Sequence, residues 1–312
     1  MTTLLILDSQ ADAYNEFVKN AHLPGLNVLL ATDPSGLPEG AALAEVVLAP
    51  PGLLIGALPR LTSLRWVQST WAGVESLLAP ELPRNYLLSG VKGVFGTQMA
   101  EYTLCYMLAH ERQVIQRFDS QRQGAWDHRM PGQLAGKHAV FLGLGSIGGE
   151  CALRCRQFGM RTSAVTRSGA QTALVDKHFQ VENLPQAVSD ADYLVMSLPD
   201  TPETRHLVDG PVLDALPPHA VIINVGRGRS LDQQALLSAM KAGELAGAVL
   251  DVFEHEPLAP GDALWDCPGI TITAHTSAVS FVEDIAPLFL ANLGRYLAGE
   301  QPHHLVDFTR GY

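Results

Sequence analysis

The chain has 312 residues, 47% of them hydrophobic and 17% charged, with a mean hydropathy of +0.11. This is a globular composition, and the length corresponds to about two domains, each able to bury its own core. Asp and Glu number 32 against 21 Lys and Arg, and the net charge of −11 excludes nucleic acid and anionic membranes as general partners.

The amino terminus and the cysteines favour a cytoplasmic protein. Residues 1–8 (MTTLLILD) lack a basic segment, and the longest uncharged apolar stretch, residues 46–59, is interrupted by prolines and a glycine. We therefore expect neither a signal peptide nor a membrane-spanning helix. No Cys-x-x-Cys pair occurs among the four cysteines, which are too few for a disulfide framework and are typical of a reducing compartment.

The amino-terminal part of the chain alternates short apolar runs with helical patterns. Buried strands are predicted at residues 4–7, 28–31, 46–49 and 64–68, which is the βαβ pattern of a parallel sheet. Apolar residues then recur at helical spacing and predict one long helix over residues 97–123, with Pro131 and Gly132 marking its exit.

A second βαβ series follows. Its strands are predicted at residues 138–142, 162–166, 193–197, 220–225, 246–250 and 270–274. The two series separated by a long helix predict two α/β domains. Residues 281–297 form a last predicted helix, and the sequence alone leaves open which domain it joins.

A glycine loop directly follows the first strand of the second series. Its sequence, Gly143-Leu144-Gly145-Ser146-Ile147-Gly148, opens a helical pattern. In a strand-loop-helix context this motif predicts dinucleotide binding, because the first glycine permits the tight turn, the second lets the backbone approach a pyrophosphate, and the third lets the helix pack on the strand. A glycine-rich turn without a ligand and a site for S-adenosylmethionine remain alternatives.

The end of the next predicted strand favours NADP over NAD. An acidic residue about twenty positions after the glycine loop would bind the ribose hydroxyls of NAD. Here the strand ends in Thr166-Arg167-Ser168, with no acid between Glu150 and Asp176. A guanidinium flanked by two hydroxyls suits the 2′-phosphate of NADP, although NAD remains possible and Arg167 is otherwise an ordinary solvated side chain.

Three later strands end beside polar residues that a buried sheet does not need for packing. Arg227, Glu256 and His275 follow these strands, and the carboxyl ends of parallel strands border one ligand crevice. Taken one at a time, each residue has an equally good explanation without a function: Arg227 as an arginine in a turn, Glu256 as a carboxylate before a proline, and His275 as a hydrogen-bonded histidine. Together they suit the reduction of a 2-oxo acid to a 2-hydroxy acid, in which Arg binds the carboxylate, His donates a proton and Glu orients the imidazole.

At this point the chain resembles the D-isomer-specific 2-hydroxyacid dehydrogenases nearly from end to end. The motifs that carry the resemblance are the glycine loop and the stretches 197–205 (SLPDTPETR), 224–228 (NVGRG), 250–258 (LDVFEHEPL), 306–307 (VD) and 311–312 (GY). The block 93–102 (GVFGTQMAEY) looks closest to the glyoxylate and hydroxypyruvate reductase branch. Two departures are Ala274, where Pro commonly precedes the catalytic His, and Glu75, where Asp is common.

The resemblance implies roles for individual residues. It makes Arg227 the carboxylate binder and Glu256 with His275 the catalytic pair, and it places Asp251 near the nicotinamide. Substrate contacts are assigned to Trp71, Ala72, Gly73 and Val74, although Trp71 and Tyr102 are equally candidates for the core. The predicted cofactor contacts are Gly143, Gly145, Ser146, Ile147, Gly148, Thr166, Arg167, Ser168, Leu198, Pro199, Thr204, Val225, Gly226 and Asp251.

The resemblance also implies an architecture. It predicts two Rossmann-like or flavodoxin-like domains with the active site in the cleft between them. Residues 1–97 and 283–312 would form a discontinuous substrate domain and residues 98–282 the dinucleotide-binding domain, through which two copies would form a homodimer.

Rival functions are a non-catalytic nucleotide sensor on the same fold, a short-chain dehydrogenase and a methyltransferase. Retention of Arg227, Glu256 and His275 argues against the first. No tyrosine is followed four residues later by a lysine, which argues against the second, and Thr166-Arg167 stands where a methyltransferase needs an acid. We therefore expect an NADP-dependent oxidoreductase acting on a small 2-oxo acid.

Overall fold

The computed structural model describes residues 1–169 and 171–311, so Tyr312 of the closing motif lies outside the described residues. The chain divides into two compact units. Unit 1 consists of Met1–Val94 and Ser280–Tyr312, and unit 2 of Phe95–Val279.

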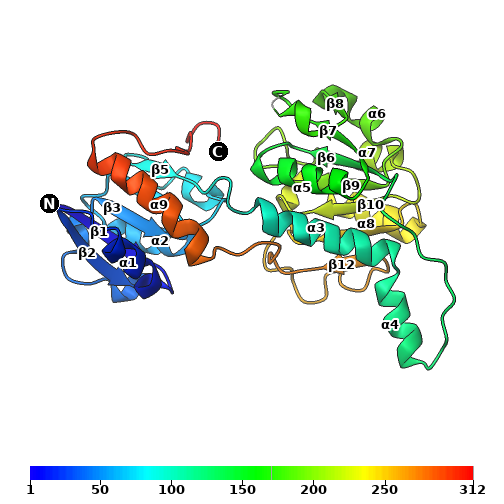
Figure 1. Cartoon of the computed structure of the whole chain (residues 1–312), viewed down its shortest axis with the longest axis horizontal. Coiled ribbons are helices and arrows are strands. Elements are labelled where there is room, and N and C mark those ends of the chain that lie inside the picture. The colour runs from blue at the N-terminus through cyan, green and yellow to red at the C-terminus, as the bar shows by residue number, and fades with distance from the viewer. Residues whose placement is uncertain (170, 312) are drawn as a thin grey trace. The chain divides into compact units, whose positions relative to one another are not determined.

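Unit 1 contains a five-stranded parallel sheet in the order β2-β1-β3-β4-β5, which is a flavodoxin-like order (Figure 1). Strands β1, β3 and β4 are almost entirely buried, as expected for apolar runs covered on both faces. The strands are β1 (Thr2–Leu7), β2 (Leu26–Ala31), β3 (Val46–Ala49), β4 (Trp66–Ser69) and β5 (Leu87–Ser89).

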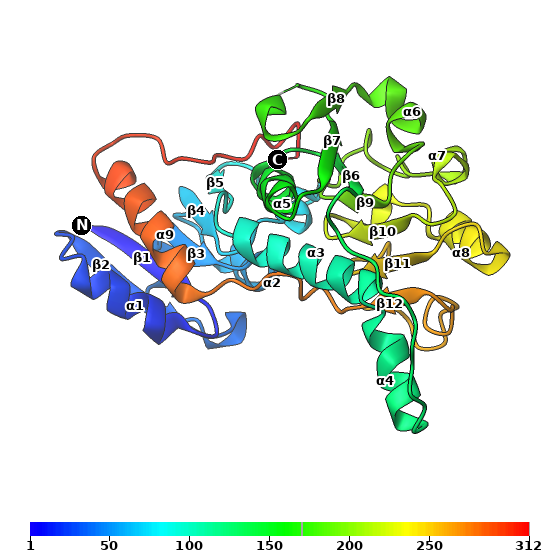
Figure 2. The ribbon, with the colours of Figure 1, turned by 45° about the vertical axis from the view of Figure 1, so that its right-hand side comes forward.

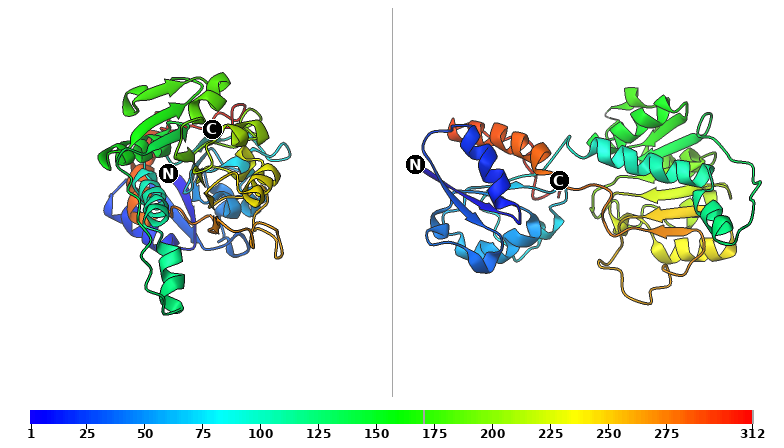
Figure 3. Two further views of the ribbon diagram at one scale, coloured as in Figure 1. Left: turned by 90° about the vertical axis from the view of Figure 1, so that its right-hand side faces the viewer. Right: turned by 60° about the horizontal axis from the view of Figure 1, so that its bottom comes forward.

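The helices of unit 1 include α1 (Ala11–Asn20), α2 (Pro51–Ala57) and α9 (Val282–Leu297). The last helix, α9, lies beside α1 (Figure 3). Its Asn292 donates a hydrogen bond to the buried Gln68 of β4 at 2.8 Å, and Trp66 stacks on Phe289 and Tyr296. The carboxyl-terminal segment is thus part of the core of unit 1.

Unit 2 contains a seven-stranded parallel sheet in the order β12-β11-β10-β9-β6-β7-β8 (Figure 2). The order reverses between β6 and β9, the arrangement of a Rossmann sheet, whose ligands bind at the carboxyl ends of the strands. The strands are β6 (His138–Leu142), β7 (Arg161–Val165), β8 (Lys177–Phe179), β9 (Tyr193–Met196), β10 (Val221–Asn224), β11 (Gly247–Leu250) and β12 (Ile270–Ile272).

Helices cover both faces of this sheet. Buried residues of α3 and α5 pack on one face, and those of α6, α7 and α8 on the other. The helices are α3 (Gly96–Glu111), α4 (Val114–Arg122), α5 (Ser146–Gln157), α6 (Leu184–Val188), α7 (Gly210–Ala215) and α8 (Gln233–Ala242). The predicted fold class, two α/β domains built on parallel sheets, is confirmed.

The single helix predicted over residues 97–123 is wrong. The chain breaks between α3 and α4 at Gln113, whose φ of +53° is left-handed. A tertiary hydrogen bond from Gly132 N–H to Glu111 O at 2.8 Å holds the break, and Arg117 donates locally across it to Arg112 O at 3.0 Å. No glycine or proline marks the break in the sequence, and apolar residues keep helical spacing on both sides of it, so the pattern predicted one helix.

Two short strands were not predicted. Strands β5 and β8 have three residues each, and Lys177-His178-Phe179 of β8 carries no apolar run. Both lie at sheet edges, where a strand needs less apolar sequence because one side is less covered. Within the described residues no helix is long and apolar enough to cross a membrane.

Candidate active site

The carboxyl ends of β6, β9 and β10 meet closely in unit 2. A Cβ added to Gly226 would lie 2.7 Å from the backbone nitrogen of Leu198, and one added to Gly148 would lie 2.1 Å from Gly143 O. The Ser197 hydroxyl donates to Leu142 O at 3.3 Å. Only glycine permits these close approaches. The glycine loop, the Val225-Gly226 turn and Leu198 therefore lie together at the carboxyl edge of the sheet.

The glycine loop has the features that a pyrophosphate requires. Gly143 has a φ of +91°, and a Cβ on Gly145 would meet no atom within 4 Å, so this part of the loop is open. Gly145 is the N-cap of α5, where no side chain caps the helix, and Ser146 and Ile147 form its first turn. Open backbone N–H groups at a helix amino terminus bind anions, so these residues fit a dinucleotide.

The hydroxyl of Thr204 holds the loop that follows β9. Thr204 Oγ1 donates to Pro199 O at 2.7 Å and accepts from Thr201 N–H at 3.0 Å. Thr204, a predicted cofactor contact, therefore uses its hydroxyl proton within the 198–204 loop. Leu198 and Pro199 stand at the start of this loop.

Asn224 at the end of β10 shapes the turn that carries Arg227. Its side chain accepts from Gly226 N–H at 3.1 Å and donates to Arg227 O at 3.2 Å. A Cβ on Gly228 would lie 1.9 Å from the carbonyl carbon of Phe253, so this turn packs directly on the loop after β11. The structure thus brings the turn of Arg227 against the segment that leads to Glu256.

Glu256 and His275 form a hydrogen-bonded pair. His275 Nδ1 lies 2.8 Å from Glu256 Oε2, and Glu256 Oε1 accepts from Phe253 N–H at 2.9 Å. The side chains are 47% and 35% exposed, so the pair is accessible to a ligand. His275 Nε2 has no hydrogen-bond partner within the described part of the chain.

This pair shifts both protonation equilibria. The hydrogen bond that His275 donates to Glu256 raises the pKa of His275 above its usual value, against the opposing effect of burial. Burial would raise the pKa of Glu256, but its bonds to His275 and to the Phe253 N–H outweigh that effect and lower it. The arrangement favours an imidazolium beside a carboxylate.

Asp251 holds the loop that carries His275. It is fully buried, and its carboxylate accepts from the N–H of Thr276 at 2.8 Å and of Ser277 at 3.0 Å, and from Thr273 Oγ1. Its carbonyl accepts from His275 N–H at 2.8 Å. These bonds hold His275 at a left-handed φ of +54°. With Ala274 before it, the imidazole still reaches Glu256.

The sequence left open whether Tyr102 and Trp71 line the substrate pocket or belong to the core, and the two residues differ in their surroundings. The Tyr102 hydroxyl lies 2.7 Å from Thr273 Oγ1 and so extends the Asp251 network into α3. Burial raises the pKa of Tyr102, which keeps its hydroxyl neutral. In unit 1, Trp71 is 52% exposed, so it is not a core residue.

Trp71 belongs to the turn that follows β4. The Ser69 hydroxyl accepts from Trp71 N–H at 3.0 Å and donates to Trp71 O at 2.8 Å. Ala72 and Gly73 continue the turn, and Val74 is buried beneath it. Glu75 begins a short 3-10 helix there.

The end of β7 carries Thr166, Arg167 and Ser168 as predicted, with a partner that the sequence analysis missed. Thr166 Oγ1 lies 2.8 Å from His178 Nε2 of β8 and accepts from Gly169 N–H at 3.1 Å. Because β8 was not predicted, no sequence signal placed His178 beside this turn.

The chain matches the family model described as D-isomer specific 2-hydroxyacid dehydrogenase, NAD binding domain, over residues 104–277. The chain belongs to this family. It is 32% identical over 256 residues to "Glyoxylate/hydroxypyruvate reductase A" of Yersinia enterocolitica, an alignment that covers 80% of this chain and 82% of that protein. The predicted family and enzyme class are confirmed, and this dehydrogenase acts as a 2-oxoacid reductase.

Solved structures of relatives share the fold. A D-isomer specific 2-hydroxyacid dehydrogenase family protein from Aeromonas salmonicida is 37% identical with a TM-score of 0.94, covering 98% of this chain and 99% of that one. A D-isomer specific 2-hydroxyacid dehydrogenase from Xanthobacter autotrophicus, solved with NADPH and MES, is 31% identical with a TM-score of 0.88, covering 100% and 99%.

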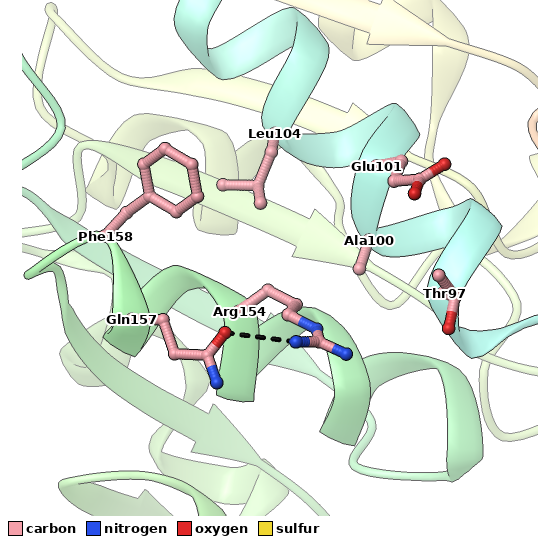
Figure 4. Close-up of a pocket in the computed structure, with 7 residues that line it drawn as sticks. All are labelled: Thr97, Ala100, Glu101, Leu104, Arg154, Gln157 and Phe158. Carbon is pink, nitrogen blue, oxygen red and sulfur yellow. Dashed lines mark hydrogen bonds between the residues drawn. The ribbon is translucent and has the colours of Figure 1, made fainter.

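A separate hollow of about 350 Å³ lies between α3 and α5 of the dehydrogenase (Figure 4). Leu104 and Phe158 border one end, and Arg154 donates to Gln157 Oε1 at 3.2 Å beside it. None of the predicted catalytic or cofactor residues lines it. It is therefore distinct from the edge that carries the glycine loop.

Proposed function

We propose that this dehydrogenase reduces a small 2-oxo acid, such as glyoxylate or hydroxypyruvate, to the D-2-hydroxy acid with NADPH. The observation that carries the proposal is the exposed His275 and Glu256 pair, at 2.8 Å, on the same sheet edge as the open glycine loop. The name of the Yersinia relative, a glyoxylate/hydroxypyruvate reductase, supports this substrate class.

In this mechanism Arg227 binds the substrate carboxylate through its guanidinium. His275 Nε2 donates a proton to the carbonyl oxygen, which becomes the hydroxyl of the product, and the neutral imidazole then regains a proton from solvent. Glu256 fixes the Nδ1 side of the ring and stabilises the protonated form through its hydrogen bond. Bound NADPH supplies the hydride to the carbonyl carbon.

Asp251 acts in this proposal by placing His275 rather than by exchanging a proton. Its buried carboxylate is engaged by the loop that carries the histidine. From unit 1, we assign backbone contacts with the carboxylate to Ala72, Gly73 and Val74, and a contact with the substrate side chain to Trp71.

The cofactor is assigned to the glycine loop and to the end of β7. Gly143, Gly145 and Gly148 fit the pyrophosphate, and Arg167 with Ser168 would bind the 2′-phosphate of NADPH. The structure of the Xanthobacter relative contains NADPH, which supports this choice.

The proposal is tested by steady-state reduction of glyoxylate, hydroxypyruvate, pyruvate and phenylpyruvate with NADPH and with NADH. We expect NADPH to be preferred by about ten- to a hundredfold in kcat/KM, because one charge-assisted hydrogen bond contributes about 1.5–3 kcal/mol. Arg167→Ala should weaken NADPH by that factor and leave NADH nearly unchanged. Equal use of both cofactors by the wild type contradicts the phosphate assignment, and no turnover with any oxo acid favours a nucleotide sensor.

Arg227→Ala tests the carboxylate assignment. Loss of a charge-assisted, bidentate contact should lower kcat/KM for the oxo acid by about 30- to 1,000-fold, with the dissociation constant of NADPH unchanged within about twofold. Cofactor binding measured by fluorescence serves as the control. Near-normal turnover of this variant would remove Arg227 from the mechanism.

We also propose that two copies associate through unit 2. Helix α4 and the segment after it project from the unit (Figure 1) and expose Phe118, Trp126 and Met130, the last two at 85% each. Such clustered apolar exposure is typical of a surface that a partner covers. Sedimentation of the wild type should give a dimer. The double variant Phe118→Ser, Trp126→Ser should dissociate more readily, and a monomeric wild type contradicts the assignment.

A further inference from the structure

Thr166 and His178 form a contact that the assigned cofactor site does not explain. His178 lies opposite Ala164 in the pairing of β7 with β8, and Thr166 follows Ala164 by two residues, so both side chains share the face of the sheet that α5 covers. Their polar atoms lie 2.8 Å apart. This is also the side whose helix begins at the glycine loop.

The hydrogen bonds at Thr166 limit what its hydroxyl can do. A threonine hydroxyl has one proton and two acceptor positions. Gly169 N–H occupies one acceptor position at 3.1 Å. If His178 Nε2 carried no proton, it would take the only proton of Thr166. If Nε2 carries a proton, His178 donates into the second acceptor position and the proton of Thr166 is available to a ligand.

We propose that His178 determines specificity for the 2′-phosphate of NADPH by acting through Thr166. With Nε2 protonated, His178 makes Thr166 a dedicated donor to the phosphate, beside Arg167. His178 is thus a positioning residue, and this inference rests on the proposed assignment of NADPH. A donor of this kind suits a phosphate, which only accepts, whereas a ribose hydroxyl is satisfied by either donor or acceptor.

The position of the imidazole supports a positioning role. A Cβ added to Gly169 would lie 3.8 Å from His178 Cε1, so the ring lies beside the 166–169 turn. Gly169 has a left-handed φ of +64°, which a glycine adopts without strain. One side chain thus fixes the direction of the Thr166 hydroxyl and lies against the turn that carries Arg167.

The experiment measures dissociation constants of NADPH, NADH, 2′,5′-ADP and 5′-ADP for the full-length enzyme by calorimetry, without substrate. His178→Phe keeps an aromatic ring but removes the hydrogen bond. We expect it to weaken NADPH and 2′,5′-ADP by about five- to tenfold, with NADH and 5′-ADP changed by less than about twofold. His178→Gln, which retains an N–H donor, should restore most of the discrimination.

Two further variants separate positioning from a general loss of structure. Thr166→Val removes the hydroxyl at nearly constant shape, and adding His178→Phe to it should weaken NADPH by less than about twofold more, because both changes act on one donor. Lys177→Met is the matched control. It removes a cation from the same strand, where Lys177 lies over the Phe179 ring at 4.5 Å, and it should leave the ratio of NADH to NADPH dissociation constants unchanged.

The outcomes are distinguishable. Loss of discrimination in Arg167→Ala but not in His178→Phe overturns the role of His178 and leaves the cofactor assignment intact. Equal weakening of NADPH and NADH in both His178→Phe and His178→Gln also overturns it, because a structural defect does not select the phosphate. A wild type that binds NADPH and NADH equally overturns both proposals.

Discussion

The seven-stranded sheet of unit 2 carries a histidine and carboxylate pair at each end of its strands. At the amino end, His138 of β6 lies 3.0 Å from Asp190 Oδ1 through Nδ1 and 2.8 Å from Ser163 Oγ through Nε2. At the carboxyl end, His275 uses Nδ1 for Glu256 at 2.8 Å. The His138 side chain is only 6% exposed, against 47% for His275.

The difference teaches that distances alone do not make a reactive site. Ser163, His138 and Asp190 have the spacing of a nucleophile, a base and an orienting acid. Ser163, however, is buried within β7, between β6 and β8, where the backbone is paired in the sheet and offers no donor to a developing oxyanion. The amino-end hydrogen bonds therefore satisfy the buried His138 and Ser163 side chains, and the carboxyl-end pair is the one to which we assign the proton transfer.

The largest expected effect comes from replacing the histidine of the carboxyl-end pair. His275→Ala should lower kcat/KM for oxo-acid reduction by about 10²- to 10⁴-fold, the usual contribution of a general acid. NADPH binding should change little, because the imidazole contacts the reacting carbonyl in the proposed mechanism. Stopped-flow reduction at saturating cofactor measures the effect, and a loss below tenfold would contradict the assignment of the proton donor.

A second expected effect concerns the pH profile. The hydrogen bond that His275 donates to the Glu256 carboxylate raises the pKa of His275, so the imidazolium that reduction needs persists to higher pH than for an isolated histidine. Glu256→Gln removes the negative charge, and the alkaline limb of kcat/KM for reduction should move to lower pH. The profile from pH 5 to 10 is the measurement, and an alkaline limb that stays in place would show that the pair is not coupled.

The smallest effect on activity is expected at the amino end. His138→Phe leaves the Ser163 hydroxyl without its partner in a buried position, which should lower the free energy of unfolding by about 1–3 kcal/mol. kcat/KM should stay within about twofold of the wild type. Urea unfolding measures the loss of stability, and the reductase assay measures kcat/KM. A large loss of activity without loss of stability would contradict the structural role of His138.

The sequence predicted the parts of the site that obey local rules. The glycine loop was recognisable because Gly143 needs a left-handed backbone and Gly148 cannot hold a Cβ, and both requirements appear as glycine in the sequence. The positions of Glu256 and His275 after two apolar strands placed them on one sheet edge, and the structure joins them by a hydrogen bond. Their catalytic roles remain proposals.

Other features were not predictable because they depend on partners that are distant in the chain. The break at Gln113 is held by bonds to the segment that returns past it, and no local breaker marks it. The place of Asp251 near the nicotinamide stays a prediction, and the sequence did not indicate that its carboxylate holds the loop of His275 at Thr276 and Ser277. Such bonds arise only when β11 and β12 are neighbours.

The amino-acid sequence by itself determined the two parallel sheets, because apolar runs of strand length must be buried on both faces, and it determined the turn that accepts a pyrophosphate. Only the tertiary structure decided which polar groups meet. Strand order brings His178 to Thr166 across 12 residues of sequence, and burial separates His138 from the exposed His275. Hydrophobic patterns are local, whereas hydrogen-bond partners and solvent access are set by the packing of the whole unit.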